Sequence, residues 1–331
     1  MPKKITSTDV GEFQNDFVQK RSFLAGVNVL VNIVFLLKKV PYFCCGCHKK
    51  YQQFMALPII TLTTDFGEKD PYVGAVKGAM YSALEGVRIV DISHGIAPFH
   101  IVEAAYVIQN AYRSFPKGSI HIIGVDGELT PENRHIAVKL DGHYFICANN
   151  GILALLSSSI NPEKVVEINI HDHMESNFPV LDVFVAAACH IARGGTLEVI
   201  GKITKDIKEL KGIQPVVNLE RNQIIGTVIY IDNYGNVVIN IQRALYQEVA
   251  KGRQPTISVR KFRIKNIYER YSDAINFDVP KDRREEAGKE LAIWNSSGFL
   301  ELAIYKSNPT SVGSASTLFG LEYRDSITIS F

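Results

Sequence analysis

Short apolar, β-branched segments alternate with longer amphipathic segments in the first half of the chain. The apolar runs at residues 57–62, 88–92 and 119–125 are typical of buried strands, and a helix is expected after each of the first two. Asp70 is the expected N-cap of the first helix and Pro71 its first residue. Strands that alternate with helices predict an α/β fold, with a mainly parallel sheet covered on both faces.

The second helix and a hairpin complete this half. The helix is expected over 101–112, with one apolar face formed by Ile101, Ala104, Ala105 and Ile108. Residues 136–140 and 144–147 read as two strands joined through Asp141-Gly142, a dipeptide that favours a tight hairpin turn.

The pattern changes after about residue 212, where strands follow one another with shorter connections. The expected strands are 216–219, 224–231, 237–241, 256–259 and 327–331. Such spacing predicts a small β-barrel or sandwich. We therefore expect an α/β N-terminal domain at 57–212 and a smaller β-rich C-terminal domain at 213–331.

Residues 1–54 lack this pattern. An apolar run at 23–37 is shorter than the ~20 residues that span a bilayer, and Asn28 and Asn32 interrupt it. No small-residue cleavage site follows, which argues against a signal peptide. We expect this extension to reflect an incorrectly assigned start, with translation beginning at Met55; a weak membrane anchor is the alternative.

Composition indicates a soluble globular protein, with 46% hydrophobic and 21% charged residues. A formal net charge of +2 gives no reason to expect a nucleic-acid partner. A local basic cluster at Lys281, Arg283 and Arg284 is followed at once by Glu285 and Glu286, so we expect a solvated helix end there.

The cysteines do not form a disulfide framework. Three lie together at residues 44–47, whereas Cys147 and Cys189 are single and lie in apolar segments. This usage fits a reducing, cytoplasmic compartment. The first group lacks a second pair of ligands at zinc-binding spacing, so we expect no metal site.

Residues at the ends of the expected strands, most of them polar, are the candidate binding and catalytic residues. The chain has no glycine-rich phosphate loop, no zinc-binding helix motif and no serine nucleophile elbow. Open α/β sheets bind ligands at the carboxyl ends of their strands. The residues found there are Asp65, Asp70, Phe99, Asp126, Arg134 and the turn at 232–236. Singly, each has a structural explanation, such as a helix cap or a tight turn. Together they favour a polyhydroxylated ligand that carries an amine.

Five segments resemble, in order, the motifs of the S-adenosylmethionine hydrolases and the related fluorinases. They are TTDFGEKDPYVGAVKG at 63–78, DISHGIAPFHIVEAA at 91–105, ANNGIL at 148–153, YIDNYGNVV at 230–238 and NSSGFLELA at 295–303. The resemblance runs from about residue 57 to the C-terminus and covers both expected domains.

The resemblance implies an α/β domain followed by a β-barrel domain, assembled as a homotrimer. The ligand would lie between the N-terminal domain of one subunit and the C-terminal domain of its neighbour. In this family pattern Asp65 would hold the ribose hydroxyls, Phe99 would pack near the adenosine and Asn236 would contact the adenine. The methionine end would be contacted by Asp70, Asp232 and Ser296. Ser297 occupies the position at which fluorinases carry an arginine for the carboxylate.

The implied reaction is hydrolysis of S-adenosylmethionine to adenosine and L-methionine, without a cofactor or a metal. The hydrolases use an Asp, Arg and His trio to activate water. Asp126 and Arg134 match the first two, but Pro179 stands at the histidine position. The alternative is a catalytically silent homologue that binds S-adenosylmethionine or adenosine. A halogenase is the least favoured, because Val180 offers no hydroxyl where fluorinases bind halide with a serine.

Overall fold

The computed structural model describes residues 58–157, 160–170, 176–210, 214–284, 286, 288–311 and 313–331. The expectations for residues 1–54 and for a start at Met55 lie outside these residues. In the part described, no helix combines the length and the apolar character needed to cross a membrane.

The first half of the described chain forms a seven-stranded sheet in the order β2-β1-β3-β5-β4-β6-β7. Strands β2, β1, β3 and β5 are parallel, whereas β4, β6 and β7 pair antiparallel at one side. The strands are β1 (Ile59–Thr64), β2 (Arg88–Ser93), β3 (Ile120–Gly124), β4 (His135–Leu140), β5 (His143–Ala148), β6 (Lys164–Ile168) and β7 (Gly201–Ile203). The expected α/β class with a largely parallel sheet is confirmed, and the 141–142 hairpin joins β4 to β5.

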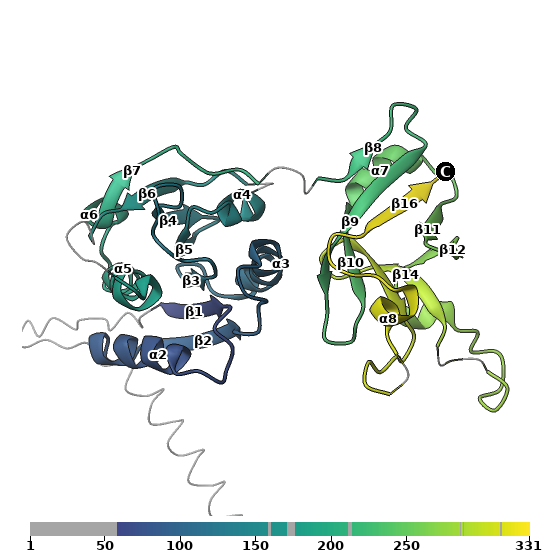
Figure 1. Cartoon of the computed structure of the whole chain (residues 1–331), viewed down its shortest axis with the longest axis horizontal. Coiled ribbons are helices and arrows are strands. Elements are labelled where there is room, and N and C mark those ends of the chain that lie inside the picture. The colour runs from purple at the N-terminus through teal and green to yellow at the C-terminus, as the bar shows by residue number, and fades with distance from the viewer. Residues whose placement is uncertain are drawn as a thin grey trace, which may run out of the picture. The chain divides into compact units, whose positions relative to one another are not determined.

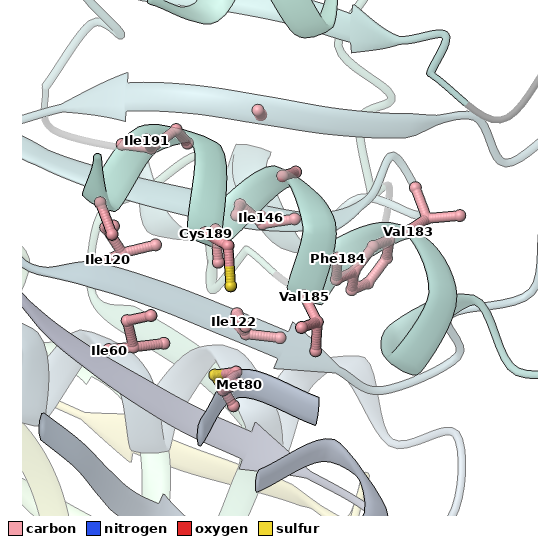
Figure 2. Packing of buried hydrophobic residues seen from close by; sticks show 14 of the residues in the cluster. Ile60, Met80, Ile120, Ile122, Ile146, Val183, Phe184, Val185, Cys189 and Ile191 are labelled. Carbon is pink, nitrogen blue, oxygen red and sulfur yellow. The ribbon is translucent and has the colours of Figure 1, made fainter. Parts of the chain in front are cut away.

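Helices cover both faces of this sheet (Figure 1). One core is built from α2 and α5, and the other from α3 and α4. Figure 2 shows Met80 of α2 and Cys189 of α5 packed with Ile60 and Ile122 of the sheet. The helices are α2 (Tyr72–Ala83), α3 (Ile101–Ala111), α4 (Ile152–Leu156), α5 (Val185–Ala192) and the short α6 (Leu197–Ile200). On α3 the buried residues are Ala104, Ala105 and Ile108, three of the four predicted for its apolar face, and Ile101 is half-buried.

The start of α2 differs from the sequence-based expectation. Pro71 is the N-cap, with φ −74° and ψ −7°, and its carbonyl accepts the hydrogen bond from Ala75 N–H at 2.9 Å. The helix therefore begins one residue later than predicted, and Asp70 is not its cap. An exposed carboxylate that no helix terminus uses is available for a ligand.

The second half of the described chain forms a nine-stranded sheet around its own apolar core, as expected for a β-rich region. Strands β14 and β15 were not among the predicted strands. The elements are β8 (Val216–Val217), β9 (Gln223–Ile231), β10 (Val237–Gln242), α7 (Arg243–Ala250), β11 (Thr256–Val259), β12 (Phe262–Ile264), β13 (Ile267–Tyr268), β14 (Glu290–Trp294), β15 (Phe299–Ile304), α8 (Ala315–Phe319) and β16 (Ser326–Ser330).

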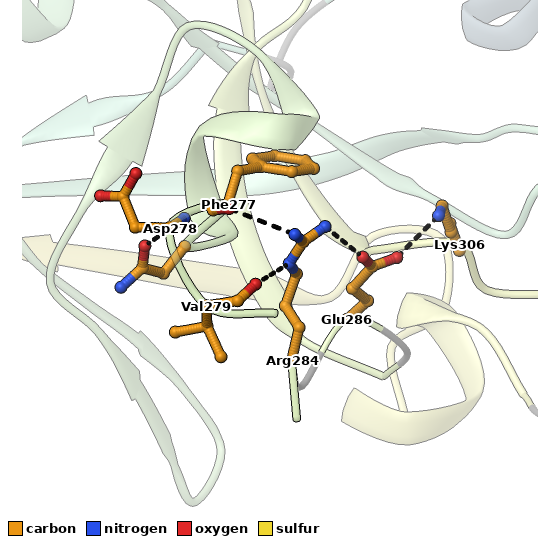
Figure 3. Close-up of polar contacts among 7 residues, drawn as sticks. Phe277, Asp278, Val279, Arg284, Glu286 and Lys306 are labelled. Atoms are coloured by element: carbon orange, nitrogen blue, oxygen red, sulfur yellow. Dashed lines mark hydrogen bonds and ion pairs between the residues drawn. The ribbon is translucent and has the colours of Figure 1, made fainter. Parts of the chain in front are cut away.

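The basic cluster near residue 284 does not end a helix, and although Lys281 and Arg283 are exposed as expected, Arg284 is not. The Arg284 side chain is only 15% exposed and donates to the carbonyl of Val279 at 2.9 Å and to Glu286 at 2.8 Å (Figure 3). Lys306 donates to the other oxygen of Glu286, also at 2.8 Å. The guanidinium therefore organises the loop before β14, which local charge alternation did not predict.

Two buried histidines lie on adjacent strands of the first sheet, His121 on β3 and His143 on β5. His121 Nδ1 is 2.7 Å from Thr61 Oγ1, and His121 Nε2 is 3.2 Å from His143 Nδ1. Burial disfavours the charged imidazolium of both rings, and the nearby His143 further disfavours a charge on His121. The pKa of His121 falls to about 3, chiefly through burial, and burial also lowers the pKa of His143.

These histidines predict a loss of stability in acid. Because the folded-state pKa of His121 lies below the unfolded value, the unfolded chain takes up the proton first as pH falls. The free energy of unfolding should therefore decline as pH drops below about 6.5 towards 3, by roughly 1 kcal/mol per pH unit from His121. Urea titrations across this range should show a shallower decline for His121→Gln than for the unaltered chain. Identical slopes would contradict a buried neutral His121.

Candidate active site

The loops after β1 and β2 bring Asp65 and Phe99 together. The backbone N–H of Phe99 donates to Oδ2 of Asp65 at 2.8 Å. Phe99 has a φ of 61°, and the residue is 73% exposed. A bulky residue in the left-handed region is strained, and such strain gathers at binding and catalytic sites. The pair forms the first part of the candidate site.

Asp126 leaves the sheet at the same edge as Asp65. Strands β1 and β3 are parallel, and Thr64 pairs with Gly124, so both carboxylates follow adjacent strand ends. Asp126 also has a left-handed backbone, with φ 48°. Ligands of open α/β sheets bind outside these carboxyl ends. The first sheet thus places the predicted ribose-binding and water-activating carboxylates on one edge.

Two consecutive asparagines, Asn149 and Asn150, hydrogen-bond to the backbone at the two ends of the loop that joins Asp126 to Arg134. The Asn150 side chain, 3% exposed, donates to the carbonyls of Val125 at 3.1 Å and Asp126 at 3.2 Å. The backbone N–H of Asn149 donates to the carbonyl of Arg134 at 2.7 Å. Sequence reasoning gave these asparagines no role, although they lie in the ANNGIL motif.

The Arg134 side chain is exposed and only weakly paired. It is 53% exposed, and its Nε lies 3.9 Å from Oε1 of Glu167, which is a weak surface pair. In the described chain no hydrogen bond or ion pair joins the side chains of Arg134 and Asp126.

Pro179 lies next to the strand end that carries Asp126. Its neighbour Val180 is buried, and a Cβ built on Gly127 would lie 3.5 Å from Val180 Cγ2. On Gly124 the corresponding distance is 3.0 Å, so Val180 packs closely against this glycine as well. Pro179 has φ −57° and ψ −31° and precedes a π-helical turn, Val180–Phe184, that leads into α5. The residue at the family's histidine position is therefore beside the Asp126 loop.

A chain of polar contacts supports the turn that carries Asp65. Thr64 Oγ1 is 2.8 Å from Nδ1 of the buried His94, whose Nε2 is 3.1 Å from Asp91 Oδ1. Lys77 donates to the other oxygen of Asp91. Partial burial favours a higher pKa for Asp91, but the hydrogen bonds from Lys77 and His94 outweigh it and lower the pKa. Asp91 and His94 belong to the second motif, yet sequence reasoning assigned them no function.

Asp232 and Asn236 form a tight turn between β9 and β10. Asp232 Oδ1 accepts from the backbone N–H groups of Tyr234 at 2.9 Å and Asn236 at 2.8 Å, and its Oδ2 accepts from Asn236 Nδ2 at 3.0 Å. Gly235 has φ 73°, and a Cβ there would meet Ser314 at 2.3 Å. The motif therefore forms a tight turn, and the hydrogen bonds of the turn fix the orientation of the Asp232 carboxylate.

Asp232 and Ser296 line one pocket of 530 Å³. The other residues of this pocket that matter below are Tyr106, Arg270, Tyr271 and Glu301. Two of the three residues predicted for the methionine end are thus together. Arg270 also lines this pocket, where its Nε and Nη2 lie 3.0 Å from Oδ1 of Asp273, and Ser297 carries no charge.

Glu301, on β15, is a buried carboxyl group in this pocket, only 4% exposed. Its Oε1 accepts from the Tyr271 hydroxyl at 2.5 Å. Burial raises the pKa of Glu301, and the nearby Asp232 raises it further. Burial likewise raises the pKa of Tyr271, and it raises that of Tyr106 to about 12. Sequence reasoning gave Glu301 no role, although it lies in the NSSGFLELA motif.

The candidate residues form two groups. Asp65, Phe99 and Asp126 lie at the edge of the first sheet, and Asp232 and Ser296 line the pocket to which Tyr106 of α3 also contributes. Within the described residues, no hydrogen bond, ion pair or ring contact joins a side chain of the first group to one of the second.

Comparison with known proteins identifies the family. The first sheet carries carboxylates at its strand ends, and residues of the second sheet line a polar pocket. Residues 60–201 match the N-terminal domain of the SAM (S-adenosylmethionine) hydroxide adenosyltransferases, and residues 226–328 match their C-terminal domain. The chain belongs to this family.

Relatives include both kinds of enzyme that the motifs resemble. An (R)-S-adenosyl-L-methionine hydrolase of Methanocaldococcus jannaschii is 30% identical over 84% of this chain and 98% of its own length. A fluorinase of Actinopolyspora mzabensis is 23% identical over 74% of this chain and 90% of its own. The crystal structure of an uncharacterized conserved protein from Thermotoga maritima covers 82% of this chain and all of its own, with 26% identity and a TM-score of 0.70. The chain is therefore similar to enzymes that process S-adenosylmethionine.

Proposed function

We propose that the chain hydrolyses S-adenosyl-L-methionine to adenosine and L-methionine. The observation that carries the proposal is the placement of Asp65 and Asp126 at adjacent strand ends, each in a strained or anchored loop. One carboxylate is then available for a ribose diol and the other for a water molecule. The hydrolase names among the relatives agree with this choice.

The proposed hydrolysis requires few catalytic groups. Water attacks the 5′ carbon of the ribose, the carbon–sulfur bond breaks, and the sulfonium leaves as the neutral thioether of methionine. No general acid is required, so the protein must orient the water in line with the breaking bond and accept its proton. Asp126 accepts that proton, and Arg134 helps to hold the water and the carboxylate. Arg270 and Ser296 bind the carboxylate of the methionine end.

Pro179 supports a second candidate, a homologue that binds S-adenosylmethionine or adenosine without turnover. Proline carries no group that could orient water or take a proton. Purified protein incubated with S-adenosylmethionine, with adenosine followed by chromatography, separates the two. Adenosine above the uncatalysed rate supports the hydrolase. Tight binding without product overturns it in favour of the silent homologue.

We expect the chain to assemble as a closed homotrimer that shares its site between subunits. Within the described residues of one chain, the side chains of Asp65, Phe99 and Asp126 form no hydrogen bond, ion pair or ring contact with those of Asp232 and Ser296. In a trimer, the Asp232 and Ser296 of a neighbouring subunit would complete the site at Asp65, Phe99 and Asp126. Cyclic assemblies of this kind are common among homo-oligomers. Light scattering at micromolar concentration should report a trimer. A monomer that still binds S-adenosylmethionine tightly would rule out the shared site.

A further inference from the structure

The turns after β1 and β2 meet at His94. The His94 carbonyl accepts from the backbone N–H of Gly67 at 2.8 Å, and its Nδ1 lies 2.8 Å from Oγ1 of Thr64. The same hydroxyl oxygen accepts from the backbone N–H of Phe66 at 3.4 Å. Asp65 lies between these contacts in the chain. His94 therefore holds the turn that carries Asp65 on both sides of that residue.

Asp91 determines which ring nitrogen of His94 carries the proton. Oδ1 of Asp91 lies 3.1 Å from Nε2 of His94, and a carboxylate only accepts hydrogen bonds. In the neutral ring Nε2 therefore carries the proton, which leaves Nδ1 as an acceptor for the Thr64 hydroxyl. Lys77 donates to the other oxygen of Asp91. The Thr64 hydroxyl is thus oriented, because it donates to His94 and keeps its lone pairs for the backbone N–H of Phe66.

Asp91, His94 and Thr64 are connected in the order of a hydrolytic triad, but burial excludes that role. Thr64 is 1% exposed and His94 is 7% exposed, whereas a triad nucleophile must be reached by its substrate. The next residue, Asp65, is half-buried, and its carboxylate accepts from the backbone N–H of Phe99 at 2.8 Å. The three connected side chains therefore support the turn, and Asp65 is the group that a ligand can reach.

We propose that His94 is a positioning residue, which acts through the Thr64 hydroxyl and the Gly67 N–H to fix the Asp65 carboxylate in the orientation that binds both hydroxyls of a ribose. The inference rests on the proposed function, because the nucleoside part of S-adenosylmethionine supplies these hydroxyls. A carboxylate that accepts two hydrogen bonds at once needs a fixed orientation. Preference for a ribose over a 2′-deoxyribose is therefore the property that His94 controls.

The test measures by calorimetry the ratio of the affinities for adenosine and 2′-deoxyadenosine. Thr64→Val removes the hydroxyl and keeps the shape of the side chain, and the ratio should fall about three- to tenfold, the usual loss for one hydrogen bond. Thr64→Ser keeps the hydroxyl and should retain the ratio. A role confined to stability would lower the melting temperature and leave the ratio unchanged.

Two variants of His94 repeat the comparison without altering Thr64. Asparagine places its side-chain oxygen close to the position of Nδ1, so His94→Asn keeps an acceptor for the Thr64 hydroxyl and should retain most of the ratio. Glutamine places its polar atoms close to the position of Nε2. His94→Gln therefore keeps the contact with Asp91, loses the acceptor for Thr64 and should lower the ratio as much as Thr64→Val does.

Thr61→Val is the matched control. Thr61 also lies on β1 and is fully buried, and its Oγ1 is 2.7 Å from Nδ1 of His121. The variant removes the same kind of buried threonine–histidine hydrogen bond from the same strand, further from the turn that carries Asp65. It should lower the melting temperature by an amount similar to that of Thr64→Val and leave the ratio unchanged.

The outcomes separate this inference from the proposed function. If the unaltered chain prefers adenosine but Thr64→Val and His94→Gln keep the full preference, or if Thr61→Val reduces it equally, His94 has no positioning role and the proposed function stands. If the unaltered chain binds both nucleosides equally, the inference fails, whereas adenosine formation from S-adenosylmethionine still tests the proposed function. If the unaltered chain binds neither nucleoside and forms no adenosine, both fail.

Discussion

Replacing Pro179 with histidine is expected to raise the rate of adenosine formation from S-adenosylmethionine by about 10²–10⁴-fold, the usual contribution of a positioned acid–base group. The affinity for the substrate should change little, because the imidazole would act on the attacking water and mainly in the transition state. Initial rates and binding constants, measured separately, would show this as a change in kcat with KM almost constant.

The backbone should accept this change. Pro179 has φ −57° and ψ −31°, which is right-handed helical geometry that histidine adopts without strain. Its neighbour Val180 packs against the glycines beside Asp126, so a side chain at position 179 starts close to the loop that carries Asp126. An unchanged melting temperature would verify that the variant folds before its rate is interpreted.

Asp126→Asn is the control for this experiment. It should abolish adenosine formation in both the unaltered and the Pro179→His backgrounds, because the amide cannot accept a proton from water. If the unaltered chain already turns over and Pro179→His does not improve it, water is activated without a histidine and our assignment of the trio is wrong at this position.

Replacing Asp65 with alanine is expected to weaken adenosine binding by about a hundredfold or more. A carboxylate that accepts from both ribose hydroxyls makes two charge-assisted hydrogen bonds, each contributing about 1.5–3 kcal/mol. For the same reason 2′-deoxyadenosine should bind poorly to the unaltered chain. Calorimetric titration with the two nucleosides measures both effects.

Asp65→Asn distinguishes the ligand contact from a structural one. Asp65 also accepts from the backbone N–H of Phe99 at 2.8 Å, and asparagine keeps an oxygen for that bond while losing the charge. The Asp65→Asn variant should therefore keep the Phe99 loop in place but lose most of its affinity for adenosine. Equal binding of adenosine and 2′-deoxyadenosine to the unaltered chain would remove Asp65 from the ribose.

The periodicity of apolar residues was enough to predict the alternating α/β half, the β-rich half and the apolar face of α3. Buried strands and amphipathic helices impose a short-range pattern on the residues that form them, so these elements are readable locally. The residues at the strand ends followed from the same reading, because a parallel sheet collects its carboxyl ends at one edge. Element ends were less readable: the cap of α2 is Pro71 rather than Asp70, since one residue of difference leaves the pattern unchanged.

The surroundings of each side chain depended on contacts between residues far apart in the chain. Glu301 is buried because β15 lies between β10 and β14, which no local pattern around residue 301 encodes. Asn150 reaches Asp126, and Val180 reaches Gly127, only through the packing of the first sheet and its helices. Local periodicity determines which face of an element is apolar, whereas the partner that covers each buried polar group is chosen by strand order and long-range packing.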